Sequence, residues 1–349
     1  MSHGRARRTI WQFMDNGPTQ AERVVLNAAL DWIIRLPPCG PETVEPVAGR
    51  VLAADIEAPF GLPDADLAAW EGEACRARDT EGASDYAPIL VSHHAVRAGD
   101  ALPPGTDAVI PAALAGGAVL APVAAGSGVL WRGGDVTPGG VALPAGLVLD
   151  PAALAMLSAL GLRRVSLLRQ PRVALLAPDA LAPMLMTAVA QAGGIGETLP
   201  AQDGMLWARA GGFDAVLLTD ASGLTQAGGK LALNVALLPE EAALGWISRA
   251  PLLLLPTLAM PCLAAFRLLA GPLVRRLAGY PDPVPVPARL TRKISSPLGV
   301  AELVWVRLAV GLATPQRVPG LAAAVGSGHV LVPPASEGFG EGAEILVWL

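Results

Sequence analysis

The sequence is short of the residue types that several classes of site require. Only three cysteines occur in 349 residues, Cys39, Cys75 and Cys262, and they form no CxxC pair and no zinc-type spacing. Because these thiols are odd in number and far apart, we expect buried, unpaired cysteines in a cytoplasmic protein. The chain has only two lysines and a net charge of −5, which argues against the basic face of a nucleic-acid-binding protein.

A long uninterrupted apolar run is missing as well. The best candidate for a membrane span is residues 250–266, and prolines at 251, 256 and 261 interrupt it. A spanning helix needs roughly 20 apolar residues. We therefore predict a buried strand, a turn and a helix here, and no membrane span. The N-terminal residues are basic without an apolar run behind them, so we expect no secretory signal.

The residues that are abundant point to an α/β protein with several domains. Apolar residues make up 52% of the chain, mean hydropathy is +0.47, and 39 glycines and 33 prolines divide the sequence into short segments. Helical spacing of apolar residues predicts an amphipathic helix over residues 19–36, which Pro37 and Pro38 end. Short strands and turns are predicted over residues 42–59 and 86–145, and a helix is predicted over 151–160 with Pro151 at its start.

The pattern changes at Arg172, where apolar strands begin to alternate with helices. The strands are predicted at RVALLAP (172–178), 214–219 and 251–255, and the helices at 181–192 and 260–278. This alternation predicts a parallel, three-layer α/β domain. A proline-rich linker and short β segments complete the chain. The predicted domains are an N-terminal domain (19–168) with a small β insertion (about 46–130), a central α/β domain (169–280) and a C-terminal β-barrel-like domain (286–349).

Five motifs in this order resemble the molybdopterin molybdotransferases, which are the bacterial MoeA proteins and the C-terminal domain of gephyrin. They are GRVLAADI (49–56), LPPGTDAVI (102–110), the long stretch RGGDVTPGGVALPAGLVLDPAALAMLSALG (132–161), QPRVALLAPDAL (170–181) and ARLTRKISSPLG (288–299). The resemblance covers most of the chain. It implies the same division into domains, and a homodimer whose active site combines one subunit's central domain with its partner's N-terminal part. It also implies insertion of molybdate into adenylylated molybdopterin with release of AMP, assisted by Mg²⁺.

The loop ADLAAWEGEAC (65–75) corresponds to the family's FDNSAMDGYAV and has lost most of its polar side chains. Asp66 is kept and Glu71 replaces the Asp of MDG, one methylene longer. The Asn and Ser become Leu and Ala, and Glu73 replaces the Tyr, adding negative charge where an anion should bind. The Asp of the family's RGED is kept as Asp135, which a turn-forming role explains equally well. Glu71 and Asp135 are candidate catalytic residues, and Asp66 is a candidate substrate ligand.

The motifs of the central domain depart further from the family. STGDEL corresponds to the shorter APDAL (177–181), in which Asp179 is the candidate catalytic carboxylate and Pro178 lacks an N–H that could bind phosphate. SGGVSxGDxD corresponds to TDASG (219–223), which offers Asp220 and Ser222 as candidate substrate ligands. Both family lysines of MKPGKPLAFG are absent from LPEEAALGW (238–246), and the Gly-Asn-Pro turn of LPGNPVSA is absent from LPTLAMPCLA (255–264). Groups that bind anions have become apolar or acidic, whereas the scaffold motifs remain.

Three functions fit this pattern. The first is a family member with impaired catalysis that acts in molybdenum cofactor biosynthesis or delivery by binding the pterin, a true molybdotransferase or a molybdoenzyme. The second is an active transferase with a sparse site of Asp66, Glu71, Asp135 and Asp179. The third is an interaction scaffold with no bound cofactor. We expect a homodimer or a heterodimer with a true molybdotransferase. The pair His93-His94 is predicted to be a sheet position, because neighbouring residues on a strand point to opposite faces and chelate poorly.

Overall fold

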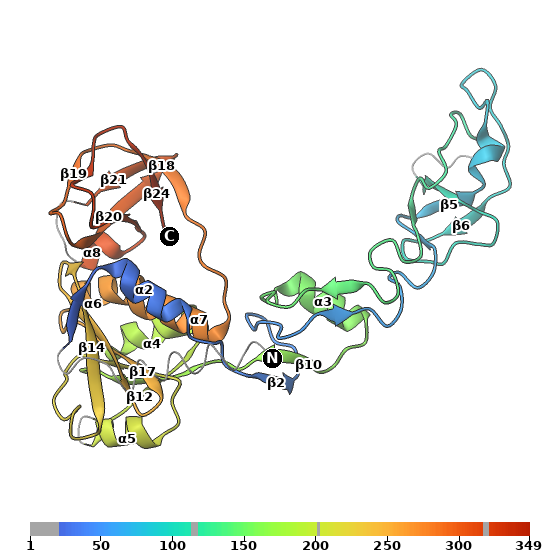
Figure 1. Ribbon diagram of the computed structural model, residues 1–349. Helices are drawn as coiled ribbons and strands as arrows, with labels where there is room; N and C mark the ends of the chain where they lie inside the picture. The colour runs from blue at the N-terminus through green and yellow to red at the C-terminus, as the bar shows by residue number, and fades with distance from the viewer. Residues whose placement is uncertain (1–20, 113–117, 201–202, 317–320) are drawn as a thin grey trace. The chain divides into compact units, whose positions relative to one another are not determined.

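The computed structural model describes residues 21–112, 118–200, 203–316 and 321–349. The chain divides into two compact units (Figure 1). Unit 1 comprises Met1–Glu42, Gly49–Val51 and Leu167–Leu349, and unit 2 comprises Thr43–Ala48 and Leu52–Ser166. Unit 2 is therefore an insertion in the sequence of unit 1, and each unit is described by itself.

Unit 1 contains a seven-stranded sheet. Its strands, in spatial order, are β1 (Glu22–Val24), β14 (Gly229–Val235), β16 (Ala242–Ile247), β17 (Ala250–Leu254), β13 (Ala215–Leu218), β11 (Arg172–Leu176) and β12 (Ile195–Thr198). The three strands predicted from their apolar runs, β11, β13 and β17, are confirmed and pair in parallel. The sheet as a whole is mixed, because β16 pairs antiparallel with both β14 and β17. These two extra strands were not predicted.

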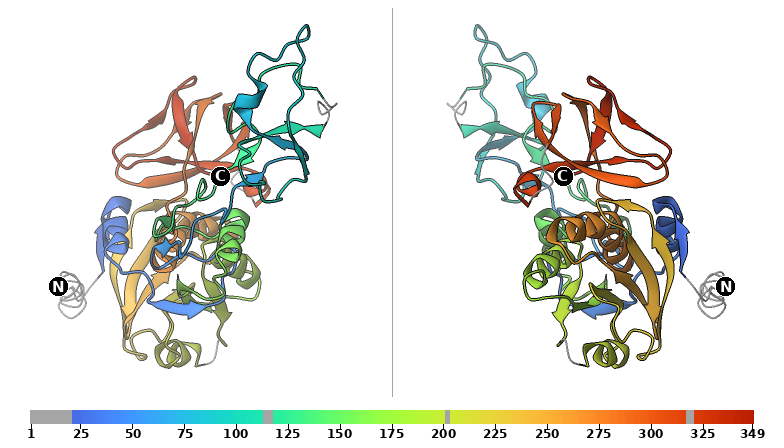
Figure 2. Two further views of the ribbon diagram at one scale, coloured as in Figure 1. Left: turned by 90° about the vertical axis from the view of Figure 1, so that its right-hand side faces the viewer. Right: turned by 90° about the vertical axis from the view of Figure 1, so that its left-hand side faces the viewer.

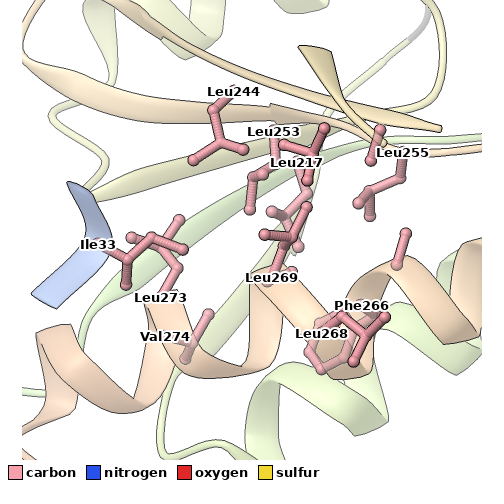
Figure 3. Close-up of a cluster of buried hydrophobic side chains, with 14 of the residues drawn as sticks. Ile33, Leu217, Leu244, Leu253, Leu255, Phe266, Leu268, Leu269, Leu273 and Val274 are labelled. Atoms are coloured by element: carbon pink, nitrogen blue, oxygen red, sulfur yellow. The ribbon is translucent and has the colours of Figure 1, made fainter. Parts of the chain in front are cut away.

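Helices cover both faces of this sheet, as the three-layer prediction requires. The helices are α2 (Leu26–Ile34), α4 (Ala182–Gln191), α5 (Gly204–Ala210), α6 (Ala259–Ala265), the π-helical turn η3 (Phe266–Ala270) and α7 (Gly271–Ala278). Residues of α2, α4, α6 and α7 share one apolar core with the sheet, and Figure 3 shows Leu217, Leu253 and Leu269 packed within it. Ala208 of α5 joins a second core on the opposite face, with Val216 and Leu252.

Two helix predictions are confirmed with changes. The predicted helix 19–36 begins only at Leu26, because Glu22–Val24 extends and pairs in parallel with β14; residues 19 and 20 lie outside the described part of the chain. The predicted helix 260–278 is present as α6, η3 and α7, with a π-helical turn in its middle. Residues 250–266 form β17 and α6 as predicted, and no helix in the described ranges is long and apolar enough to cross a membrane.

The C-terminal part of unit 1, shown in red in Figure 2, consists mainly of β-strands. Its main sheet contains β15 (Leu237–Leu238), β20 (Ala301–Ala309), β21 (Leu312–Pro315), β18 (Val286–Leu290), β24 (Glu344–Val347) and β22 (Gly328–Val332). A small hairpin of β19 (Ile294–Ser295) and β23 (Gly338–Phe339) and the short helix α8 (Leu321–Ala324) accompany it. These strands confirm the predicted C-terminal β domain, and Val306, Val330 and Val347 are fully buried in its core.

The described residues of unit 2 form short strands, a 3₁₀ turn and an α-helix. A three-stranded sheet is formed by β6 (His94–Val96), β5 (Gly72–Cys75) and β7 (Ala108–Pro111), with the 3₁₀ turn η1 (Ala77–Thr80) after β5. Two further pairs are β4 (Leu67–Ala68) with β8 (Val129–Leu130), and β3 (Ile56–Glu57) with β9 (Val141–Leu143). The predicted helix is α3 (Pro151–Ala159), whose N-cap Asp150 accepts a hydrogen bond of 2.7 Å from the Ala153 N–H. The strands β2 (Pro41–Val44) and β10 (Val165–Leu168) contain the first and the last of the points where the chain passes between units.

Candidate functional site

A shallow hollow in unit 2 contains one of the predicted site residues. Its volume is about 430 Å³, and it is lined by Glu71, Gly72, Glu73, Ala95, Val96, Arg97, Asp100 and Ala112. The central strand β5 supplies Gly72 and Glu73, and the glycine is required there. A Cβ atom on Gly72 would lie 1.9 Å from the carbonyl oxygen of Ile110 on the neighbouring strand β7. The Glu71-Gly72 step therefore lets β5 and β7 approach closely and leaves Glu71 exposed at the hollow.

The hollow carries more negative than positive charge. Glu71, Glu73 and Asp100 supply three carboxylates against the single guanidinium of Arg97. Asp100 accepts a hydrogen bond of 2.8 Å from the backbone N–H of Arg97, and the Nε2 atom of His93 lies 3.6 Å from Oε1 of Glu73. An anionic ligand such as a phosphate would meet net repulsion here, since like charges in a site disfavour one another.

Asp66 and Asp135 do not line this hollow. The Oδ1 atom of Asp66 accepts a hydrogen bond of 2.8 Å from the backbone N–H of Arg132, so this carboxylate holds two segments of unit 2 together. Asp135 is exposed, and its backbone N–H donates to the carbonyl oxygen of Leu62. Of the three candidates in unit 2, Glu71 is the one that lines this hollow.

The remaining candidates lie in unit 1, at one edge of the central sheet. Asp179 is exposed in the turn between β11 and α4, and Asp220 follows β13. Since β11 and β13 are neighbouring parallel strands, these loops leave the sheet at the carboxyl end that commonly binds ligands in α/β folds. Oδ1 of Asp220 accepts hydrogen bonds from the backbone N–H (2.9 Å) and the hydroxyl (2.8 Å) of Ser222, and these bonds lower the pKa of Asp220. The structure brings Asp220 and Ser222 together, but as a self-contained turn.

The sequence did not predict the strongest polar network of unit 1. Both carboxylate oxygens of Asp214, just before β13, accept hydrogen bonds from Arg169 at 2.7 and 2.8 Å. The backbone N–H of Arg172 donates a third bond of 2.8 Å to Asp214. Despite the opposing effect of burial, these bonds hold the pKa of Asp214 below its ordinary value. The pair closes the amino-terminal end of β13, opposite to the loops of Asp179 and Asp220, and stabilises the fold.

The three thiols are buried and unpaired, as predicted. Burial is the main cause that raises the pKa of the Cys39 and Cys262 thiols to about 12. Since only the thiolate is an effective nucleophile or metal ligand, neither cysteine contributes to a reactive site.

Within the described part of a single chain, the candidate carboxylates are not grouped as a Mg²⁺ site would require. Among the described residues, no group of three or more His, Cys, Asp or Glu side chains is placed to hold a metal ion. A hard cation requires several oxygen ligands converging on one point, whereas Asp66 and Asp220 are already engaged in turns.

The N-terminal two fifths of the sequence are similar to known proteins. Residues 20–161 match the family model of the MoeA N-terminal region (domain I and II). Molybdopterin molybdenumtransferase 2 of Mycobacterium tuberculosis is 30% identical over 161 residues, covering 39% of this chain and 40% of the relative. Molybdopterin molybdenumtransferase of Staphylococcus aureus is 28% identical over 158 residues, covering 38% of each chain. The match therefore spans about two fifths of the length of these curated relatives.

Solved structures match over nearly the whole chain. The molybdopterin biosynthesis MoeA protein from Pyrococcus horikoshii OT3 has a TM-score of 0.79 and 25% sequence identity, covering 94% of this chain and 100% of that one. A molybdenum cofactor biosynthesis protein from Pyrococcus furiosus has a TM-score of 0.66 at 22% identity, with 94% and 100% coverage, and supports the fold alone.

Proposed function

We propose that this chain acts in molybdenum cofactor biosynthesis as a catalytically impaired member of the MoeA family that binds the pterin or a partner protein. The observation that carries this proposal is the charge of the hollow in unit 2. Three carboxylates and one arginine line it, at the loop that corresponds to the family's FDNSAMDGYAV. The family's substrate carries a pyrophosphate, and molybdate is an anion, so this lining opposes both.

The loops of the central sheet support the same conclusion. A phosphate or oxyanion is commonly held by backbone N–H groups and by hydroxyl or lysine side chains. Here Pro178 removes one N–H at the end of β11, and the Ser222 hydroxyl and N–H both donate to Asp220. The two Ser222 donors would therefore have to leave the Asp220 carboxylate before they could bind an anion.

One observation favours the alternative of an active molybdotransferase. Asp179 and Asp220 lie in loops at the same edge of the parallel strands, where a substrate would be expected. In that case Glu71, Asp135 and Asp66 would supply the remaining carboxylates, and Mg²⁺ would have to bind in an arrangement that these residues do not form within either unit.

Complementation separates these functions. The full chain would be expressed in a bacterial strain that lacks its molybdotransferase, with growth on nitrate through a molybdenum-dependent reductase as the measurement. We expect no growth from this chain and full growth from an intact MoeA protein expressed to the same level. Growth supported by this chain, and lost on Asp179→Asn, would establish the active alternative.

Binding measurements then distinguish a pterin-binding role from a pure scaffold. Isothermal titration of the full chain with adenylylated molybdopterin should release heat if the pterin is retained as a ligand. If no heat is measured, a pull-down with a true molybdotransferase tests the heterodimer and the scaffold role. The homodimer expected from the resemblance is tested in the same preparation by sedimentation velocity.

A further inference from the structure

Two exposed tryptophans of unit 2 are held by one glycine turn. Trp70 precedes Glu71 of the hollow, and Trp131 follows β8. Their side chains are 39% and 46% exposed, although tryptophan is usually well covered. The molybdopterin chemistry proposed above does not use either ring.

The turn at residues 124–128 fixes both rings in place. Gly126 and Gly128 have φ values of +84° and +68°, a conformation that favours glycine. A Cβ atom on Gly128 would lie 2.6 Å from the ring of Trp70, and one on Gly126 would lie 3.3 Å from Nε1 of Trp131. Both indoles therefore lie directly against the backbone of this turn, where any other side chain would displace them.

Hydrogen bonds join this assembly to the sheet beneath it. The Gly126 N–H donates to the carbonyl oxygen of Asp107 (2.7 Å), and the Val109 N–H donates to that of Ser127 (2.8 Å). Nε1 of Trp70 donates to the carbonyl oxygen of Val109 at 3.2 Å. The ring of Trp70 is thus held in one orientation, with little rotamer entropy left to lose when a ligand covers it.

Unit 2, which carries both rings, is acidic as a whole, although the exposed Arg132 directly follows Trp131. Unit 2 contains 14 aspartates and glutamates, six arginines and no lysine, a net charge of −8, whereas the whole chain carries −5. The rest of the chain is therefore net positive by 3. Glu71, Glu73 and Asp100 place part of this negative charge in the hollow, whose lining begins with Glu71, the residue after Trp70. Preformed tryptophan rings with neighbouring carboxylates are suited to arginine side chains, which stack on indole faces and pair with carboxylates.

We propose that Trp70, Trp131 and the acidic hollow form a docking surface for a basic, arginine-bearing segment of a partner protein. An arginine stacks on an exposed indole, and a second basic side chain enters the hollow, where Glu71 and Glu73 neutralise it. Tryptophan and arginine are the residues that most often dominate binding energy at protein interfaces. Charge complementarity selects a basic partner, and the fixed rings give the surface its specificity.

A labelled dodecapeptide of alternating arginine and serine, titrated against the full chain by fluorescence anisotropy, tests this surface. We expect saturable binding to the unchanged chain. Trp131→Ala should raise the dissociation constant at least 5-fold. The double variant Glu71→Gln, Glu73→Gln should raise it at least as much, and its affinity should depend less steeply on salt concentration. Trp207→Ala is the matched control, since Trp207 is 60% exposed in unit 1 and should leave the dissociation constant unchanged. Trp131→Phe keeps an aromatic ring and should retain most of the affinity, which separates a binding defect from misfolding.

Three results would overturn the proposal. Equal binding of the same peptide with citrulline in place of arginine would show that charge is not recognised. Equal dissociation constants for Trp131→Ala and Trp207→Ala, or no binding to the unchanged chain, would show that this surface is not the docking site. If sedimentation velocity shows that Trp131→Ala converts a dimer into a monomer, the rings belong to an interface between two copies of this chain and not to a basic partner.

Discussion

Acidification should destabilise the C-terminal β domain through one buried histidine. His329 on β22 is only 7% exposed, and its ring lies 5.9 Å from that of Trp305 and 6.0 Å from that of Trp348. Its Nδ1 atom has no hydrogen-bond partner. Burial, and then the positive charge of Arg267, lower the pKa of His329 from its ordinary value of 6.5 to about 4. The folded domain therefore requires the neutral imidazole.

The magnitude follows from the difference between the folded and unfolded pKa values. A difference of roughly 2.5 pKa units corresponds to about 3 kcal/mol, present in full above pH 6.5 and lost as the pH falls toward 4. About 2 kcal/mol of this loss lies between pH 7.5 and pH 5. The measurement is the free energy of unfolding in guanidinium chloride at both pH values, for the unchanged chain and for His329→Phe.

His329→Phe should reduce the pH dependence by about 2 kcal/mol, because phenylalanine keeps the aromatic packing and cannot be protonated. His94→Phe is the matched control, because His94 is exposed, and it should retain the full pH dependence. An NMR titration of the four histidines should show one imidazole that titrates near pH 4. If His329→Phe and the unchanged chain lose the same free energy between pH 7.5 and pH 5, the reasoning from burial is refuted.

Two further substitutions test the cores and the glycine turn. Leu217→Ala, at a fully buried position of β13, should lower the free energy of unfolding by about 3 kcal/mol. Leu346→Ala, at a half-exposed position of β24, should lower it by less than about 1 kcal/mol. Similar losses for both substitutions would contradict the assigned core. Gly128→Ala places a Cβ atom 2.6 Å from the ring of Trp70 at a position with positive φ, and it should lower the free energy of unfolding by about 2 kcal/mol or more. Gly139 also has a positive φ, but a Cβ atom there would meet no other atom within 4 Å. Gly139→Ala should therefore lower the free energy of unfolding by only about 1 kcal/mol. Thermal melts followed by tryptophan fluorescence would measure both, and a smaller loss for Gly128→Ala than for Gly139→Ala would show that the ring is not held against the turn.

The sequence was sufficient to predict the strands and helices whose patterns are locally distinctive. β11, β13 and β17 are uniformly apolar and alternate with helices, which is typical of strands buried on both faces. Helix α3 combines Asp150 as N-cap with Pro151 in its first turn. In such segments the local preference and the tertiary environment agree.

Segments decided by distant pairing could not be predicted in this way. Residues 22–24 fit a helical spacing, yet they form β1 because β14, more than 200 residues later, offers an unpaired edge. The run from 229 to 247 contains mixed apolar and acidic residues that fit neither period clearly. It becomes the antiparallel pair β14 and β16 with an irregularity at Leu231 and Leu233. Long-range contacts override local propensity in both cases.

The candidate site shows the same limit. The sequence located Glu71 on a loop with altered polarity, and the structure places it at a hollow. The neighbouring charges of Arg97 and Asp100 come from a segment that is brought to Glu71 by the pairing of β5 with β6 and by backbone hydrogen bonds to Ala68. Their convergence depends on strand register, which a single sequence does not reveal.

Because unit 2 is inserted in the sequence of unit 1, the folding of unit 2 affects how the sheet of unit 1 assembles. Strand β1 and helix α2 precede the insertion, but the strands and helices that they pack against follow it. Docking β1 on β14 must therefore close a chain segment that includes residues 52–166, at an entropic cost of about 4 kcal/mol if that segment is unfolded. A folded insertion holds its own two ends at fixed positions and removes most of that cost. Mutations that destabilise unit 2 should consequently slow the assembly of the central sheet, even though they alter none of its contacts.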